Sequence, residues 1–317
     1  MPIHDLGYRR WDEERTSANL RWQVMAEVGI RQAWAITAVR RAVFLALTPA
    51  LFALSALFWI EQGFSNTMAR DGFLRMIAEW PQSGDAMKEM VEGGTSRHSL
   101  WAFVLMIFLR YPQGICMLVL IGIIGPPLIS RDVRSRAFLL YFSRPISRVQ
   151  YVIGKGAILA TYLLLITAIP ATMIYAFGLL LSPKFVLLDT WDIPFRIFFS
   201  SLVLIIPSTS LMLCLSSLTT ESRNAGFAWY VIWVLGGIAY RSLSALDVTV
   251  NSYDFTTHYS SWTLISPYHM MGRVQSYVFG LAPLDGQQVL PSMIVLTLFT
   301  AFCLTVLFRR VSAPMRI

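Results

Sequence analysis

Long apolar stretches, each bounded by charged or turn-forming residues, dominate the chain. A helix needs about 20 predominantly apolar residues to cross the hydrocarbon core of a bilayer. Six stretches approach or exceed this length, and we expect six transmembrane helices at residues 42–60, 100–129, 151–181, 195–218, 225–240 and 289–308. The pattern therefore predicts an all-α integral membrane protein whose residues 42–308 form the membrane domain.

Prolines interrupt several of these apolar stretches. Pro112, Pro170 and Pro207 lie inside predicted crossings, where each removes a backbone donor and can kink the helix. The hydroxyl side chains of residues 208–210 follow Pro207 and are expected to satisfy the backbone groups that it frees. Residues 125–127, Gly-Pro-Pro, are expected to end the second crossing.

The polar N-terminus, residues 1–41, contains one further helical pattern. From Ser17 to Thr37 apolar and charged residues alternate, and Glu27 and Arg31 stand four residues apart. The tryptophan and arginine content fits an interfacial elbow helix that lies in the headgroup layer. The alternative is a soluble helix packed on its own chain.

Two long polar segments, residues 61–99 and 241–288, are expected on the outer side of the membrane. In the second, Ser266 and Pro267 have the residue types of an N-cap and first position of a helix that runs towards Phe279. This helix is too polar to span a bilayer. We therefore expect it to be re-entrant, dipping into the outer leaflet between the fifth and sixth crossings.

The composition agrees with a membrane protein and sets its orientation. Hydrophobic residues make up 56% of the 317 residues, charged residues only 14%, and the formal net charge is +8. The cations cluster beside the apolar stretches rather than on one soluble face, so they fit the positive-inside rule better than a nucleic-acid interface. Both termini, including the tail at 309–317, are expected in the cytoplasm, and we expect no nucleic acid as a partner.

Several kinds of chemistry have no candidate residues. The only Gly-Lys, at Gly154 and Lys155, lacks the following Ser or Thr of a phosphate-binding loop. The predicted crossings contain no acid and no histidine, which speaks against proton-driven transport. No metalloprotease or serine-hydrolase motif is present. We therefore expect a chain that is not an enzyme, with no catalytic or metal-ligating residues and no cofactor of its own.

The most cationic short segment, residues 129–155, connects the second and third crossings. Asp132 and Arg136 are spaced as an i,i+4 pair. An uncharged stretch, residues 137–142, lies between arginines and is too short to span a bilayer. It fits a short helix that presents Phe138 and neighbouring aromatics to another protein, with Pro145 at its end. The alternative is that this stretch lies flat in the inner leaflet as an anchor.

This segment resembles the cytoplasmic coupling segment of ABC-2-type transporter permeases. The resemblance rests on Ser-Arg-Pro-Ile-Ser-Arg at 143–148, then Tyr151 and Gly154-Lys155, with Asp132 ahead of the apolar pentad. The order of elbow helix, six crossings, coupling helix and outer re-entrant helices is similar too. Where the family often has Gly-Thr, this chain has Arg136-Ala137.

The resemblance implies partners and a location. In that family two permease chains pair, and two copies of a separate ABC ATPase subunit, which binds ATP and Mg, dock on the coupling helices. We expect a permease subunit of an ABC exporter in the lipid bilayer of a bacterial cytoplasmic membrane. Gly236-Gly237 offers a surface for close helix contact, in keeping with a homodimer or related heterodimer. The alternative function is a non-transporting anchor or sensor that uses its outer segments.

Two sets of candidate site residues follow. The expected ATPase-coupling residues are Asp132, Arg136, Phe138, Leu139, Tyr141, Phe142, Ser143, Arg144, Pro145 and Arg148. The expected pathway residues are Arg110, Ser208, Thr209 and Ser210. Facing lipid at mid-depth would cost an arginine about 3 kcal/mol, so we expect Arg110 to snorkel to the outer headgroups or, alternatively, to face a wet cavity.

Overall fold

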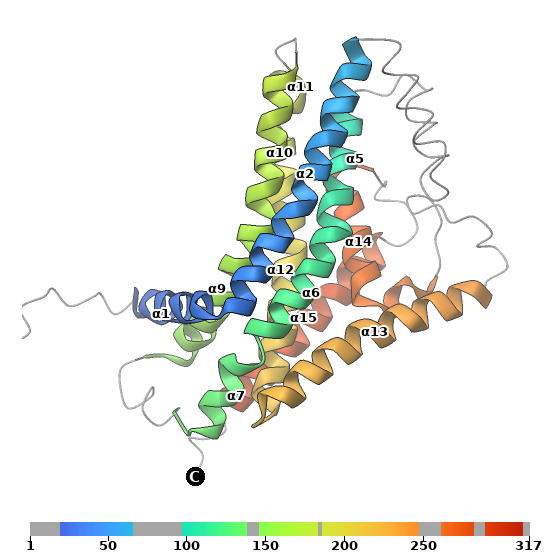
Figure 1. The fold of residues 1–317 in the computed structure, drawn as a ribbon. Coiled ribbons are helices and arrows are strands. Elements are labelled where there is room, and N and C mark those ends of the chain that lie inside the picture. Colours follow the sequence, from blue (N-terminus) through green and yellow to red (C-terminus); the bar gives the residue numbers. More distant parts are fainter. Residues whose placement is uncertain are drawn as a thin grey trace, which may run out of the picture.

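The computed structural model describes residues 20–65, 97–137, 146–182, 186–246, 261–281 and 289–312. These residues contain helices and no β-strand (Figure 1). The helices are α1 (Arg21–Ala35), α2 (Thr37–Ser65), α5 (Arg97–Arg110), α6 (Pro112–Ile124), α7 (Pro127–Arg134), α9 (Arg148–Ile166), α10 (Ala168–Leu181), α11 (Leu187–Thr190), α12 (Ile193–Leu218), α13 (Ser222–Leu246), the 3₁₀-helix η2 (Ser261–Ile265), α14 (Pro267–Val278) and α15 (Val289–Ser312). The all-α prediction is confirmed for these residues.

Within the described part of the chain, five helical runs are long and apolar enough to cross a membrane. They are Thr37–Gln62, Arg97–Arg134, Arg148–Leu181, Leu187–Leu218 and Val289–Val311. These runs coincide with the predicted first, second, third, fourth and sixth crossings. The predicted fifth crossing at 225–240 lies within α13, which is not among the five. Figure 1 shows α13 inclined against the other long helices.

Three breaks between helices lie at or near prolines. The chain passes from α5 to α6 at Tyr111, just before Pro112, and from α6 to α7 at residues 125–126. In the third run the break falls at Thr167, three residues ahead of Pro170. A proline ring clashes with the carbonyl of the residue four positions earlier, here Ile166, which is the last residue of α9. Helix α12 continues through Pro207.

Helix α1 lies across the bundle and turns sharply into α2 (Figure 1). The turn is made at Ile36, whose backbone is extended. Glu27 and Arg31 form the expected ion pair at 2.6 Å, on an exposed face. On the opposite side, α1 packs on α9: Tyr162 donates a hydrogen bond to the carbonyl of Ile30 at 2.7 Å and stacks on Trp34.

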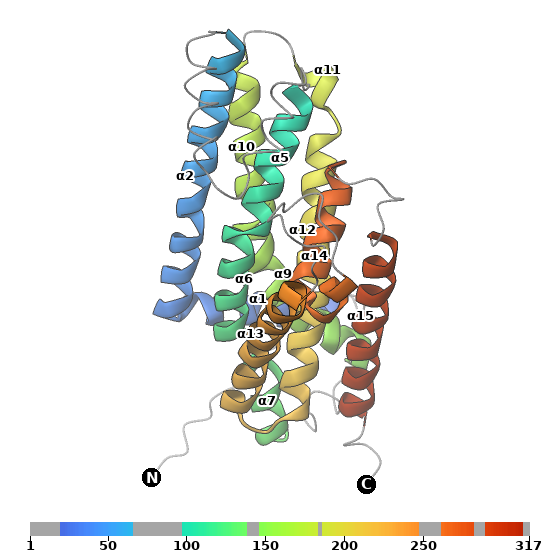
Figure 2. The ribbon, with the colours of Figure 1, turned by 90° about the vertical axis from the view of Figure 1, so that its right-hand side faces the viewer.

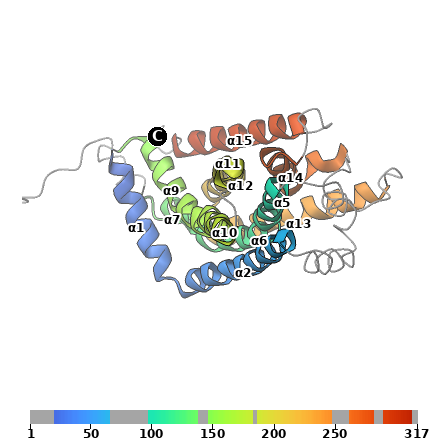
Figure 3. The same cartoon turned by 90° about the horizontal axis from the view of Figure 1, so that it is seen from above.

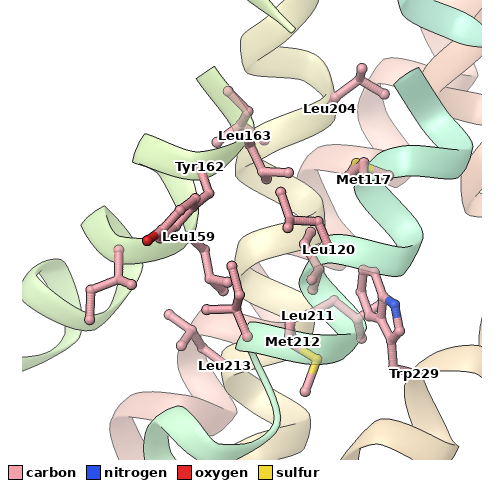
Figure 4. Close-up of a cluster of buried hydrophobic side chains, with 14 of the residues drawn as sticks. Met117, Leu120, Leu159, Tyr162, Leu163, Leu204, Leu211, Met212, Leu213 and Trp229 are labelled. Carbon is pink, nitrogen blue, oxygen red and sulfur yellow. The ribbon is translucent and has the colours of Figure 1, made fainter. Parts of the chain in front are cut away.

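Helix α12 occupies the centre of the bundle, between α9 and α10, α5, α14 and α15 (Figure 3). In its most apolar window 72% of the residues are buried, against 22% in α2. Figure 4 shows the packing around it: Leu204, Leu211 and Met212 of α12 meet Leu120 and Leu163 of neighbouring helices. By contrast, α2 exposes Phe44, Leu45, Leu51 and Phe52, as a lipid-facing helix does.

Candidate functional site

The predicted coupling segment connects α7 to α9 in the sequence, and α7 lies at the lower end of the bundle in Figure 1. Seven of its candidate residues lie outside the described residues: Phe138, Leu139, Tyr141, Phe142, Ser143, Arg144 and Pro145. The ends of the two flanking helices are described, however. They fix the two points between which this segment runs.

Helix α7 is tied at its start to α12. Because Pro126 and Pro127 have no N–H groups, the first free donors of α7 are those that follow. The N–H groups of Ile129 and Ser130 donate to Oγ of Ser216 at 3.1 and 3.0 Å, and the Ser216 hydroxyl donates to the carbonyl of Pro126 at 2.7 Å. Through these bonds Ser216, which is fully buried, serves as a cap supplied by another helix.

At its other end α7 is tied to α9. Oδ2 of Asp132 lies 2.7 Å from Nζ of Lys155 and accepts a hydrogen bond of 2.7 Å from the hydroxyl of Tyr151. The Asp132 and Lys155 side chains are only 13% and 11% exposed, and Tyr151 is fully buried. These three side chains form what we call the α7–α9 clamp. Because the pair is shielded from solvent, removing one partner leaves a buried charge unpaired and costs far more than breaking a surface ion pair.

The predicted i,i+4 pair of Asp132 with Arg136 is wrong. Helix α7 ends at Arg134, and Arg136 lies beyond it with a φ of 52°. The N–H of Arg136 bonds to the carbonyl of Val133, and the N–H of Ala137 to that of Asp132, which is the Schellman arrangement of a helix end. The Asp132 carboxylate is thus free to pair with Lys155.

The start of α9 is also well defined. Ser147 is its N-cap: Oγ of Ser147 accepts from the N–H of Gln150 at 3.2 Å, and the Gln150 side chain accepts from the N–H of Ser147 at 3.1 Å. Arg148 is the first residue of the helix and is exposed. The predicted coupling segment is therefore flanked on both sides by capped helix ends.

The second candidate region is the junction of α5 and α6, where Arg110 lies. Arg110 is 8% exposed, and its guanidinium packs on α14 at Gly272, where an added Cβ would lie 2.6 Å from Nε. The hydroxyl of Tyr268, one turn earlier on α14, donates to the carbonyl of Arg110 at 3.3 Å. The prediction that Arg110 snorkels to the headgroups is wrong, because α14 covers this side chain.

Neighbouring aromatic and imidazole groups complete the surroundings of Arg110. His269 stacks on Tyr240 of α13 with ring centroids 3.6 Å apart, and the Arg110 guanidinium lies 5.4 Å from the centre of the Tyr111 ring. Burial, together with the positive charges of Arg110 and Arg241, lowers the pKa of His269 to about 3. The imidazole is therefore neutral at physiological pH. We call Arg110, Tyr240, Tyr268 and His269 the Arg110 cluster.

The other predicted pathway residues make different contacts. Ser208 Oγ lies 3.3 Å from Sδ of Met117 and 4.0 Å from that of Met271. Ser210 donates to the carbonyls of Ile206 and Pro207, within its own helix, and Thr209 is buried beside it. All three residues are buried in the bundle, and the contacts of Ser208 and Ser210 do not involve the Arg110 cluster.

The predicted outer helix is present as α14, and one of the two predicted glycines, Gly236, lies against its start. Ser266 and Pro267 are the N-cap and first residue of α14, although the Ser266 side chain makes no capping hydrogen bond. Gly236 of α13 lies against this turn, with an added Cβ 3.5 Å from Cδ of Pro267, whereas nothing lies within 4 Å of such a Cβ at Gly237. The close neighbour of Gly236 is therefore a segment of the same chain.

The comparison with known protein families agrees with this architecture. The sequence model of the ABC-2 family transporter proteins matches residues 35–313, which include every described helix from α2 to α15 in full. The chain belongs to the ABC-2 transporter family. No curated protein matches it significantly. Membership makes the chain a multi-pass membrane subunit of permease type, a class that is generally non-catalytic and that associates with ABC ATPases. Among the described residues, no three metal-ligating side chains gather into a site.

Two residues that matter most for this geometry were not among the predicted site residues. Nothing in the sequence around Ser216 marks it as a cap. The two consecutive prolines at the start of α7 do mark a helix start, whose first N–H groups need acceptors from outside the helix. Gly272 was equally inconspicuous, since a lone glycine in a polar helix has many explanations. In both cases the partner lies more than 80 residues away in the sequence.

Proposed function

We propose that this chain is the permease subunit of an ABC exporter. Two copies of a separate ATPase subunit, with ATP and Mg, dock on the segment between α7 and α9 and drive a rearrangement of two paired permease chains. The membrane is the cytoplasmic membrane of a bacterium, with both termini in the cytoplasm. In this arrangement α1 is the interfacial elbow, α13 is the fifth of six crossings, and η2 with α14 forms the re-entrant outer element.

The observation that carries this proposal is the fastening of α7 at both ends. Ser216 binds its start to α12, and the α7–α9 clamp binds its end to α9. A force applied to the connecting segment therefore acts on the central helix of the bundle and on the third crossing together. A segment that merely anchored the chain in the inner leaflet would not need flanking helices fastened in this way.

Docking is tested with the double variant Phe138→Ala, Tyr141→Ala. Truncating aromatic anchors at an interface costs about 2 kcal/mol or more per hot spot. We expect the variant to insert with normal topology but to lose co-purification with its ATPase, or to lose transport-coupled ATP hydrolysis. Arg144→Ala is the matched control, because an exposed rim charge contributes under about 1 kcal/mol. A double variant that binds its ATPase and transports normally would overturn the coupling assignment and favour the anchor function.

Orientation is tested by cysteine labelling in intact cells. Ser83→Cys and Ser252→Cys should react with an impermeant thiol reagent from outside, whereas Ser135→Cys should not. Of the three native cysteines Cys214 and Cys303 are buried and Cys116 is half-buried, so the chain without an added cysteine gives the background. Labelling at position 135 would show that the orientation is reversed.

A further inference from the structure

The Arg110 cluster contains a buried positive charge without a counter-charge in the described part of the chain. The close pairs of basic and acidic side chains there are Arg31–Glu27, Arg97–Glu61, His98–Asp192, Lys155–Asp132 and Arg196–Asp192. None includes Arg110, whose Nε has no hydrogen-bond partner although it is fully buried. A buried, unpaired charge is costly, so proteins retain one mainly where a ligand neutralises it.

The groups around this charge suit an anion. His269 and Gly272 are one turn apart on the same face of α14, and Gly272 packs on the guanidinium. Nδ1 of His269 is also buried without a hydrogen-bond partner. The other charged group that acts on His269 is Arg241, a second cation. The cluster therefore presents the unused N–H of Arg110 Nε, an imidazole nitrogen without a partner and positive charge, which suit an oxyanion.

The position of the cluster indicates which class of anionic ligand it could bind. Arg110 is the fourteenth residue of the run that begins at Arg97, so it lies about 20 Å along a run of 38 residues. That depth is inside the bundle rather than at its end, and α14 lies beside α5, α12 and α15 there (Figure 2). The Tyr111 ring lies near the guanidinium, and the rings of Tyr240 and Tyr268 contact His269. A site that joins apolar walls to a buried guanidinium fits an amphiphile with an anionic head.

We propose that the Arg110 cluster binds the phosphate group of a lipid-like amphiphile, with Arg110 neutralising its charge and His269 donating one hydrogen bond. Gly272 is required because its missing side chain leaves room for the guanidinium. The inference rests on the proposed transport function for its purpose, since the amphiphile would be cargo. Its chemistry does not depend on that function.

The test measures binding to the purified chain in an uncharged detergent, without any ATPase, so its outcome is separate from that of the docking test above. Dihexanoylphosphatidylglycerol is titrated while the unfolding temperature is followed, because a ligand that binds the folded state raises that temperature. Inorganic phosphate and uncharged dihexanoylglycerol are titrated in parallel. We expect a saturable rise with the phospholipid and none with dihexanoylglycerol. A saturable rise with inorganic phosphate as well would support the same site with a free anion as its ligand.

Variants tie the binding to the cluster. Arg110→Gln should weaken the apparent Kd about 10-fold or more, as expected for a lost hydrogen bond to a charged group, while Arg110→Lys should retain most of the affinity. Arg223→Gln removes an exposed arginine of α13 and should leave binding unchanged. His269→Phe keeps a ring on Tyr240 and should weaken binding about 5-fold, so it tests the site even if Arg110→Gln fails to fold. Equal binding by the wild type and by these cluster variants, or no binding at all, would overturn the proposal.

Discussion

Breaking the α7–α9 clamp should destabilise the chain strongly. Asp132 accepts from both Lys155 and Tyr151 at 2.7 Å, in surroundings where the two charged side chains are 13% and 11% exposed. Asp132→Ala leaves a mostly buried ammonium group without a partner, and losing one member of a buried pair costs about 3–5 kcal/mol. Because some exposure remains, we expect a loss of about 3 kcal/mol in the free energy of unfolding.

The assay is a double-mutant cycle on the purified chain, with unfolding followed in a denaturing detergent. Lys155→Met removes the charge but keeps the length of the side chain, so the double variant no longer buries an unpaired charge. We expect the double variant to lose less stability than the two single variants together, with a coupling energy of about 2 kcal/mol. Glu27→Ala is the matched control: its pair with Arg31 is exposed, and it should cost under about 0.5 kcal/mol.

Two results would contradict this expectation: Asp132→Ala costs no more than Glu27→Ala, or the cycle is additive. Either result would mean that Asp132 and Lys155 do not depend on each other in the folded chain. The fastening of α7 would then rest on Ser216 alone. The proposal that a force on the coupling segment reaches α9 directly would lose its support.

Three other substitutions test the packing around α7 and α9, each by the free energy of unfolding. Gly154→Ala should cost about 1–3 kcal/mol, because the added Cβ would lie 3.1 Å from the α1 backbone. Gly156→Ala, whose added Cβ would lie 3.7 Å from its nearest neighbour, should be nearly neutral, and equal costs would contradict this. Ser216→Ala should cost about 2 kcal/mol, because it leaves two N–H groups of α7 without an acceptor. Ser217→Ala should cost less, because the Ser217 hydroxyl bonds within its own helix. The reverse order would refute the cap. Arg136→Gly should stabilise the chain by about 0.5–1 kcal/mol, since glycine adopts a positive φ without strain, and a loss of stability would mean that the side chain matters more.

Crossings and breaks could be predicted from the sequence because both depend on local properties. Apolar length located five membrane-spanning runs, and the lack of a proline N–H located the breaks at residues 111 and 125–126. The shifted break at Thr167 is equally local, since the clash of Pro170 falls on the carbonyl of Ile166. The inclination of α13 was not predictable in this way, because it depends on which helices surround it.

Partners of polar residues were predicted poorly for the same reason. The i,i+4 spacing predicted that Arg136 pairs with Asp132. This spacing brings side chains together only while the helix continues, and α7 ends at Arg134. The partner that the structure gives, Lys155, lies on a different helix, α9, and meets Asp132 only through the tertiary fold. Arg110 likewise meets Gly272 through a contact between helices far apart in sequence. Spacing along the chain carries no information about such contacts.

Helix α12 connects the two candidate regions, and this gives the central helix a part in both proposals. Ser216, near its end, caps α7 beside the coupling segment. Ser200, about 24 Å earlier along the helix, accepts a hydrogen bond of 3.1 Å from the buried Gln275 side chain of α14. Gln275 is three residues from Gly272, the residue on which the Arg110 guanidinium packs. A displacement of α7 cannot leave α12 unaffected while its cap is intact, and α12 in turn contacts the helix that covers Arg110. A chain that only anchored a partner would have no use for this continuity, whereas a permease must link its ATPase-facing end to the site that holds its cargo.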